Sequence, residues 1–94
     1  MNALFVPPPG TPVEVVWRDH YQPSGPAWWN AEDVRALSVA ENRTVGYLID
    51  ADADRLVVAS SIAPQDEHTD TLYGSPFVIL RPCIVTLRSL TPCV

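Results

Sequence analysis

The sequence predicts a mainly β protein, with a small, five-stranded, partly open barrel and one short helix. Three observations support this fold class. The 94 residues suffice for one core only, and the ten prolines disfavour long helices because proline fixes φ and has no backbone donor. Short apolar runs of period two alternate with clusters of turn-forming residues. We therefore expect an extended N-terminal arm over residues 1–11 and a small β-barrel domain over residues 12–94.

The first strand is expected to begin near Pro12. Val13, Val15 and Trp17 recur at every second position, which is typical of a half-buried strand. Residues 18–29, RDHYQPSGPAWW, combine Pro, Gly and Ser with aromatic side chains, so this run is interpreted as a long loop. Loops of that length usually carry function.

A short helix and then a β-hairpin are expected next. Asn30 offers an N-cap oxygen to a helix predicted from about Ala31 to Val39. The β-rich runs TVGYLID (44–50) and RLVVASSI (55–62) flank the acidic turn ADAD, which predicts a hairpin. Gly46 inside the first run indicates a bulge or the close approach of another backbone.

Both faces of this hairpin carry apolar residues. Val45, Tyr47 and Ile49 share one face by alternation, and Gly46 and Leu48 share the other. Because neither face is clearly polar, we expect the pair either to curl into a barrel or to be covered by a second subunit.

The C-terminal third predicts a loop and two more strands. Residues 63–75 are polar and rich in turn formers, so a second long loop is expected. FVIL (77–80) predicts a strand, which Pro82 ends because it cannot donate to a ladder, and IVTLRSL (84–90) predicts the last strand. The last strand is apolar on both sides, so two alternatives remain for the residues that face the core. They are Val85 and Leu87, or Ile84 and Leu90.

The charge balance disfavours binding to a nucleic acid polymer. Eleven acidic residues oppose six basic ones, all arginine, for a net charge of −5, whereas neutralising phosphates along a polymer requires a basic face. No apolar run approaches the length of about 18 residues that a membrane span needs, and the N-terminus lacks the features of a secretory signal. We expect a cytoplasmic protein without membrane contact, in which Cys83 and Cys93 are free thiols, although their pairing is left open.

Metal and catalytic motifs are weak. Asp50, Asp52 and Asp54 resemble the start of a calcium loop, but Arg55 stands where glycine is needed and Ser61 where the bidentate glutamate belongs. We interpret the three carboxylates as a solvated hairpin turn and expect no metal and no cofactor.

An enzyme is the less favoured class. The sequence has no GxSxG and no glycine-rich phosphate loop, so we expect no catalysis. His20 and His68 each lie beside carboxylates, and a metal-dependent hydrolase built on the two histidines is kept as a third hypothesis.

Two resemblances bear on these expectations. The strand order over about residues 12–90, with its FVILRPCIV ending, resembles the Src-homology-3-like and Sm-like small barrels, which implies an architecture only. VEVVWRD (13–19), the tryptophan pair before NAEDV, and RTVGYLIDADADRLVVASS (43–61) are similar to short proteins encoded by bacteriophages and prophages. That similarity implies a protein of the host bacterial cytoplasm, and such proteins often counter host immunity, sometimes as oligomers that sequester nucleotide signals.

The candidate binding residues are aromatic rings and arginines. Aromatic rings can stack on a base, and arginine suits a planar contact to phosphate. We therefore predict a non-enzymatic protein that binds a small anionic, nucleotide-like ligand at the interface of a homo-oligomer. The alternative is a protein-interaction module that binds and inhibits a host protein. The predicted ligand-binding residues are Arg18, Tyr21, Trp28, Trp29, Arg43, Tyr73 and Arg81.

Overall fold

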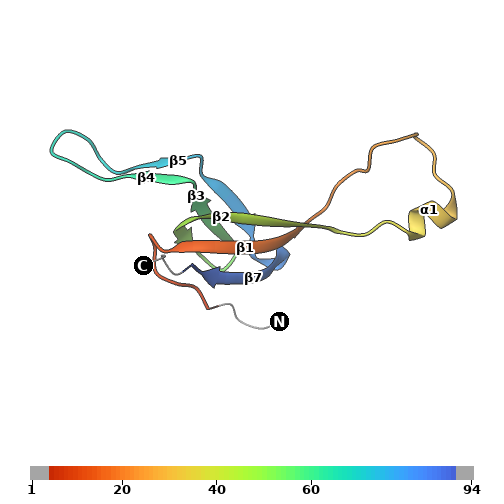
Figure 1. Cartoon of the computed structure of the whole chain (residues 1–94), viewed down its shortest axis with the longest axis horizontal. Coiled ribbons are helices and arrows are strands. Elements are labelled where there is room, and N and C mark those ends of the chain that lie inside the picture. The colour runs from red at the N-terminus through yellow and green to blue at the C-terminus, as the bar shows by residue number, and fades with distance from the viewer. Residues whose placement is uncertain (1–4, 91–94) are drawn as a thin grey trace.

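The structure is a computed structural model that describes residues 5–90, shown in Figure 1. The elements in chain order are β1 (Pro12–Asp19), α1 (Ala31–Arg35), β2 (Ala40–Ala51), β3 (Arg55–Ala59), β4 (Ser61–Ala63), β5 (Leu72–Gly74), β6 (Phe77–Leu80), the 3-10 helix η1 (Arg81–Cys83) and β7 (Ile84–Ser89).

Five antiparallel strands form the main sheet in the order β6-β3-β2-β1-β7. The predicted mainly β fold with five such strands and one short α-helix is therefore confirmed. The sheet is not closed into a barrel, because β6 and β7 are its two edges and do not pair with each other. A single 3-10 turn containing Pro82 separates these two strands, as the sequence predicts.

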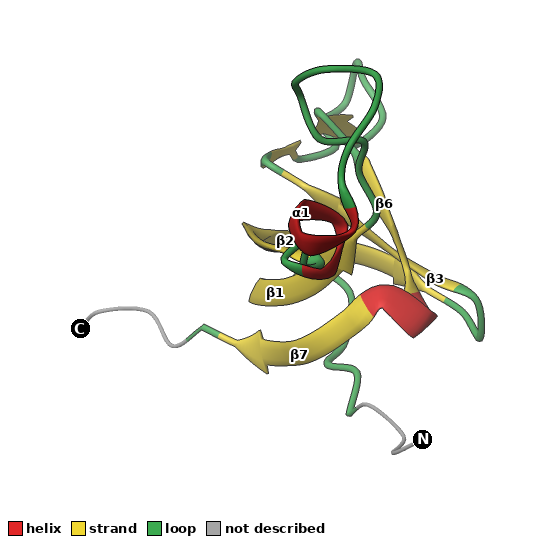
Figure 2. Cartoon of the chain, turned by 90° about the vertical axis from the view of Figure 1, so that its right-hand side faces the viewer, coloured by secondary structure: helices red, strands yellow, loops and turns green. Residues whose placement is uncertain are grey.

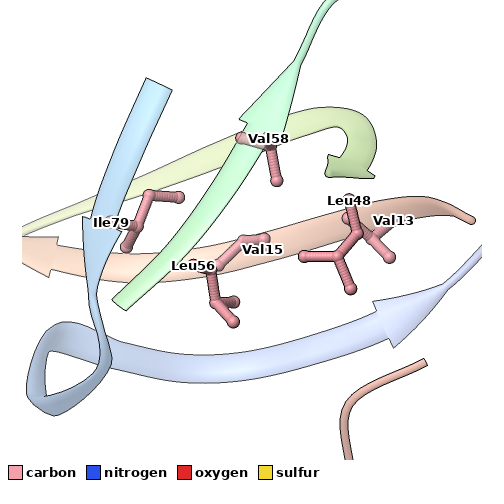
Figure 3. Packing of buried hydrophobic residues seen from close by; sticks show 6 residues of the cluster. All are labelled: Val13, Val15, Leu48, Leu56, Val58 and Ile79. Carbon is pink, nitrogen blue, oxygen red and sulfur yellow. The ribbon is translucent and has the colours of Figure 1, made fainter. Parts of the chain in front are cut away.

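The core consists of six buried side chains, which project toward one another from four strands (Figure 3). Burying an aliphatic side chain of this kind contributes about 1.5–3 kcal/mol. In β1, Val13 and Val15 are buried two positions apart, which is the period-two pattern read from the sequence. The six residues are Val13, Val15, Leu48, Leu56, Val58 and Ile79.

Two arms extend from opposite ends of this core (Figure 1). The first continues the β1–β2 ladder to the pair Asp19–Ala40 and carries α1. The second is the short sheet of β4 and β5 with its loop. The molecule measures 61 × 31 × 30 Å, and its Cα radius of gyration is 17.5 Å, where about 12 Å is usual for a compact chain of this length. Figure 1 shows α1 at the far end of the first arm, and Figure 2 views the molecule along that arm with α1 in front of the sheet.

The N-terminal segment is extended and tied to β2. The Gly10 amide donates to the Leu48 carbonyl over 2.6 Å, and the Leu48 amide donates to the Thr11 carbonyl over 2.9 Å. Val6 packs against the core. Part of the predicted arm, residues 1–4, and the predicted end of the domain, residues 91–94, lie outside the described residues.

Several element boundaries differ from the prediction. The helix ends at Arg35 and not at Val39, because the chain must already turn at Ala36 to enter β2 at Ala40. The first strand runs on through Asp19, so the loop begins two residues later than expected.

The region expected to be a second long loop contains a short hairpin. Ser61–Ala63 pairs with Leu72–Gly74, and the chain breaks from β3 at Ser60. In β7, Ile84 and Leu87 pack against the core, which matches neither of the two choices left open. A register shift between Val16 and Trp17 in β1 accounts for this, since it changes which β7 residue lies opposite each β1 residue.

Candidate binding surface at the end of the first arm

Residues 20–39, called here the arm tip, connect β1 to β2. Asn30 caps α1, since its Oδ1 accepts a hydrogen bond of 2.8 Å from the Asp33 amide, as predicted. Tyr21 closes the base of the loop by donating from its hydroxyl to the Ser38 carbonyl over 2.9 Å. No residue of α1 is buried, and isolated helices shorter than about 12 residues are marginal in water. The arm tip therefore lacks packing that would stabilise it within one chain.

Two open hollows lie in the arm tip. The first has a volume of about 370 Å³ and the second about 570 Å³, which is within the range of small-molecule sites. Leu37 and Pro23 contribute to both. The first is lined by Asp19, His20, Tyr21, Pro23, Leu37, Ser38 and Val39. The second is lined by Gln22, Pro23, Gly25, Pro26, Ala27, Trp29, Val34 and Leu37.

The two adjacent tryptophans play different parts. The Trp29 indole donates to the Pro26 carbonyl over 2.8 Å and lies against Gly25, whose φ of 136° is rarely available to other residues. Trp28 is 91% exposed. A large ring held fully in solvent is unusual, because its burial is strongly favourable, so Trp28 is free to stack on a ligand or a partner.

The predicted arginines lie outside the hollows. Arg18 is exposed on β1 at the base of the arm, opposite Glu41. Arg43 lies on β2, 3.9 Å from a carboxylate oxygen of Glu14. Arg81 begins η1, where its amide donates to the Asp54 carbonyl over 2.9 Å, and its Nε is buried without a hydrogen-bond partner.

The structure thus brings together only part of the predicted set. Tyr21, Trp28 and Trp29 share the arm tip, and Arg18 lies at its base. Tyr73 lies on β5 in the opposite arm. The sequence reading missed Leu37 and Val39 as lining residues, because it placed both in a helix from about Ala31 to Val39.

The two histidines are also far apart. His20 follows β1, with Nδ1 3.9 Å from Asp19, whereas His68 lies in the loop of the other arm, 3.3 Å from Glu67. Residues 5–90 contain no group of three or more His, Cys, Asp or Glu side chains placed to hold a metal. The geometry gives no support to a site shared by both histidines.

Two loop carboxylates have lowered pKa values. Backbone amides of Asp54 and Arg55 donate to Asp52, and this holds the pKa of its carboxyl below the ordinary value. Amides of His68 and Thr69 lower the pKa of Asp66 in the same way. In both turns the aspartate side chain takes the place of a backbone acceptor. The β2–β3 turn is the solvated hairpin turn that the sequence analysis expected.

Comparison with protein-family models, curated proteins and solved structures finds no match to this chain. Among the described residues, no helix is long and apolar enough to cross a membrane.

Proposed function

We propose that this chain is a non-enzymatic accessory protein that binds a small anionic, nucleotide-like ligand between copies of itself. The observation that carries the proposal is the exposed Trp28 ring next to Trp29, which lines the second hollow. Stacking of a base on an aromatic ring contributes about 1–3 kcal/mol. The arm tip would therefore hold the planar part of the ligand.

The anionic part requires positive charge from elsewhere. No arginine lines either hollow, and Asp19 lines the first, so a phosphate placed there by one chain would meet a carboxylate. Arg43 and Arg81 lie on the core, away from the arm tip. A second copy could supply these guanidinium groups, which suit bidentate phosphate contacts.

We further propose that the ligand comes from a bacterial host, as the resemblance to short bacteriophage proteins drawn from the sequence implies. On this proposal the protein acts by sequestration in the host cytoplasm, which requires binding without turnover. Cyclic nucleotides and ADP-ribose derivatives are the first compounds to test, because each combines a base with phosphate.

Isothermal titration calorimetry of the full chain with these compounds tests the proposal. We expect saturable binding, no chemical change in the recovered ligand, and at least a tenfold loss of affinity in Trp28→Ala and in Arg43→Gln. Thr86→Ala, a change at an exposed position of β7 outside the predicted binding residues, is the control and should leave affinity unchanged. Absence of heat with every compound would overturn the proposal.

A host protein is the second candidate partner. The first hollow favours it, since Tyr21, Leu37 and Val39 could receive an apolar side chain while Asp19 repels a phosphate. Capture from bacterial lysate should then recover one protein in stoichiometric amount, and Trp28→Ala should abolish its recovery while Tyr73→Leu does not. Equal recovery with both variants would rule out this candidate.

A further inference from the structure

The outer face of the main sheet carries an apolar surface that no part of residues 5–90 covers. Leu48, Leu56 and Ile79 point into the core, so their neighbours in β2, β3 and β6 point outward. Four of these outward residues are large, apolar and exposed, and are called here the outer patch. They are Val45, Tyr47, Val78 and Leu80.

The residues of the outer patch lie on β2 and β6, the two strands that flank β3. Val78 pairs with Val57, and Tyr47 pairs with Ala59 two residues further along β3. The solvent face of an antiparallel sheet is usually polar, and a contiguous exposed apolar surface commonly marks an interaction site. The outer patch therefore requires an occupant.

The chain's own arm tip does not cover the outer patch. The β1–β2 ladder stays paired through Arg18–Glu41 and Asp19–Ala40, and this stiff ribbon directs the arm tip away from the core (Figure 1). Each chain thus presents two uncovered apolar surfaces, the arm tip and the outer patch, that cannot meet within the same molecule.

The exposed area indicates how much surface awaits a partner. The chain exposes 7336 Å², where about 5,400 Å² is usual for a monomer of this mass. The excess of about 1,900 Å² includes the two extended arms and the residues outside 5–90, so it marks an unusually open chain. A standard interface buries about 800 Å² on each partner, which a chain this open can supply.

Charge favours the arm tip of another copy as the occupant. Glu32 and Asp33 make the first turn of α1 acidic, and Arg35 lies in its last turn. Arg43 lies next to Val45 on β2, and Arg81 follows Leu80 directly. An acidic, aromatic arm tip therefore complements an apolar patch with arginine at both ends.

We propose that the arm tip of one copy packs on the outer patch of the next, in a head-to-tail contact. Such a contact is heterologous, so repeating it produces a closed ring or an open chain of copies. The inference rests on the proposed function for its ligand, because the neighbour's outer patch carries an arginine at each end, Arg43 or Arg81, that can lie near the arm tip. The self-association itself needs no ligand.

Three matched glutamate variants of the full chain test the contact. Trp28→Glu removes the arm-tip anchor, Val78→Glu places a charge in the outer patch, and Thr86→Glu is the control, since Thr86 is exposed on β7, two strands away from β2. Light scattering coupled to size exclusion, without ligand, measures their masses. We expect the unmodified chain and Thr86→Glu to be multimers, and the other two to be monomers of 10.3 kDa.

Mixing distinguishes head-to-tail packing from a symmetric contact. Trp28→Glu has an unchanged outer patch, and Val78→Glu has an unchanged arm tip. The arm tip of Val78→Glu can therefore pack on the outer patch of Trp28→Glu, and an equimolar mixture should form a species of twice 10.3 kDa. A symmetric contact between two patches would leave Trp28→Glu dimeric by itself, and a symmetric contact between two arm tips would leave Val78→Glu dimeric by itself. Either result would overturn the proposal, as would an unmodified chain that is monomeric. Circular dichroism checks folding, and Leu80→Glu replaces Val78→Glu if the latter unfolds. If the chain assembles as expected but calorimetry detects no binding, the proposed ligand is refuted and the head-to-tail contact is still supported.

Discussion

The rings of Trp17 and Phe77 lie with their centroids 5.5 Å apart and their planes tilted by 49°. Trp17 is on β1 and Phe77 on β6, two strands that are not neighbours in the sheet. The Trp17 indole also donates to the Thr44 hydroxyl over 2.9 Å, which fixes its orientation. This aromatic contact therefore connects β1, at the base of the first arm, to the edge strand β6, which lies next to the second arm.

A double-mutant cycle measures that contact. Aromatic pairs contribute about 0.5–1.5 kcal/mol beyond the area they bury, so Trp17→Leu and Phe77→Leu should show a coupling free energy of that size in urea unfolding. Tyr73→Leu combined with Trp17→Leu is the control pair and should be additive. Additivity in the Trp17–Phe77 cycle would mean that the rings are neighbours without mutual stabilisation.

Gly46 should not tolerate a side chain. A Cβ at Gly46 would lie 2.7 Å from the Ala59 carbonyl oxygen, and neither strand backbone can yield without breaking the β2–β3 ladder. We expect Gly46→Ala to reduce the free energy of unfolding by about 1–3 kcal/mol, measured by chemical denaturation.

Gly74→Ala is the matched control for that substitution. Its Cβ would meet the Ser61 hydroxyl, which can rotate away, so the cost should be well below that of Gly46→Ala. An equal loss for both variants would contradict the distinction between a backbone clash and a side-chain clash.

Leucines of the core and of the outer patch should respond differently to truncation. Leu56 is 0% exposed and Leu80 is 57% exposed, although they lie on neighbouring strands. Leu56→Ala should cost about 2–5 kcal/mol. Leu80→Ala should change the unfolding free energy by less than about 0.5 kcal/mol when measured on monomers. Similar losses at both positions would show that the outer patch is part of the core.

The β2–β3 turn should loosen in acid. The amides of Asp54 and Arg55 bind the ionised carboxylate of Asp52 and lower its pKa. A group with a lowered folded pKa stabilises the native state above its unfolded pKa of about 4, and this contribution is lost as the pH falls through the folded value. Carbon-13 NMR should give Asp52 a lower pKa than an aspartate in an unstructured peptide. The chemical shift of the Asp54 amide should change over the same pH range as the Asp52 carboxyl. Coincident titration of protein and peptide would refute this.

The sequence predicted most of the main sheet because its signals are local. Alternating valines predicted the position of β1, and the ADAD turn predicted the position of the β2–β3 hairpin. Pro82 predicted the break between β6 and β7. Gly46 was expected to allow a close backbone approach, and the Ala59 carbonyl makes that approach. Each of these depends on residues within a few positions of one another.

The remaining features depend on distant contacts and could not be read locally. The β4–β5 strands have only three residues each, too few for a periodic pattern. The shift at Val16/Trp17 decides that Ile84 and Leu87 face the core, and no local pattern encodes it. The separation of Tyr73 from the tryptophans follows from the directions of the two arms, which composition does not specify.

Crosslinking between copies tests the central claim most directly. A chain carrying Ala27→Cys beside Trp28 and Ala53→Cys in the turn near Leu80, with Cys83→Ser and Cys93→Ser to remove the native thiols, is treated with a short bis-maleimide reagent at low protein concentration. Both positions are exposed and lie outside the anchor and the outer patch. If the arm tip of one copy meets the outer patch of another, denaturing gels should show a ladder of covalent multimers, which the single Ala27→Cys variant in the same background should not form. A product that stays at the mass of one chain would contradict the account.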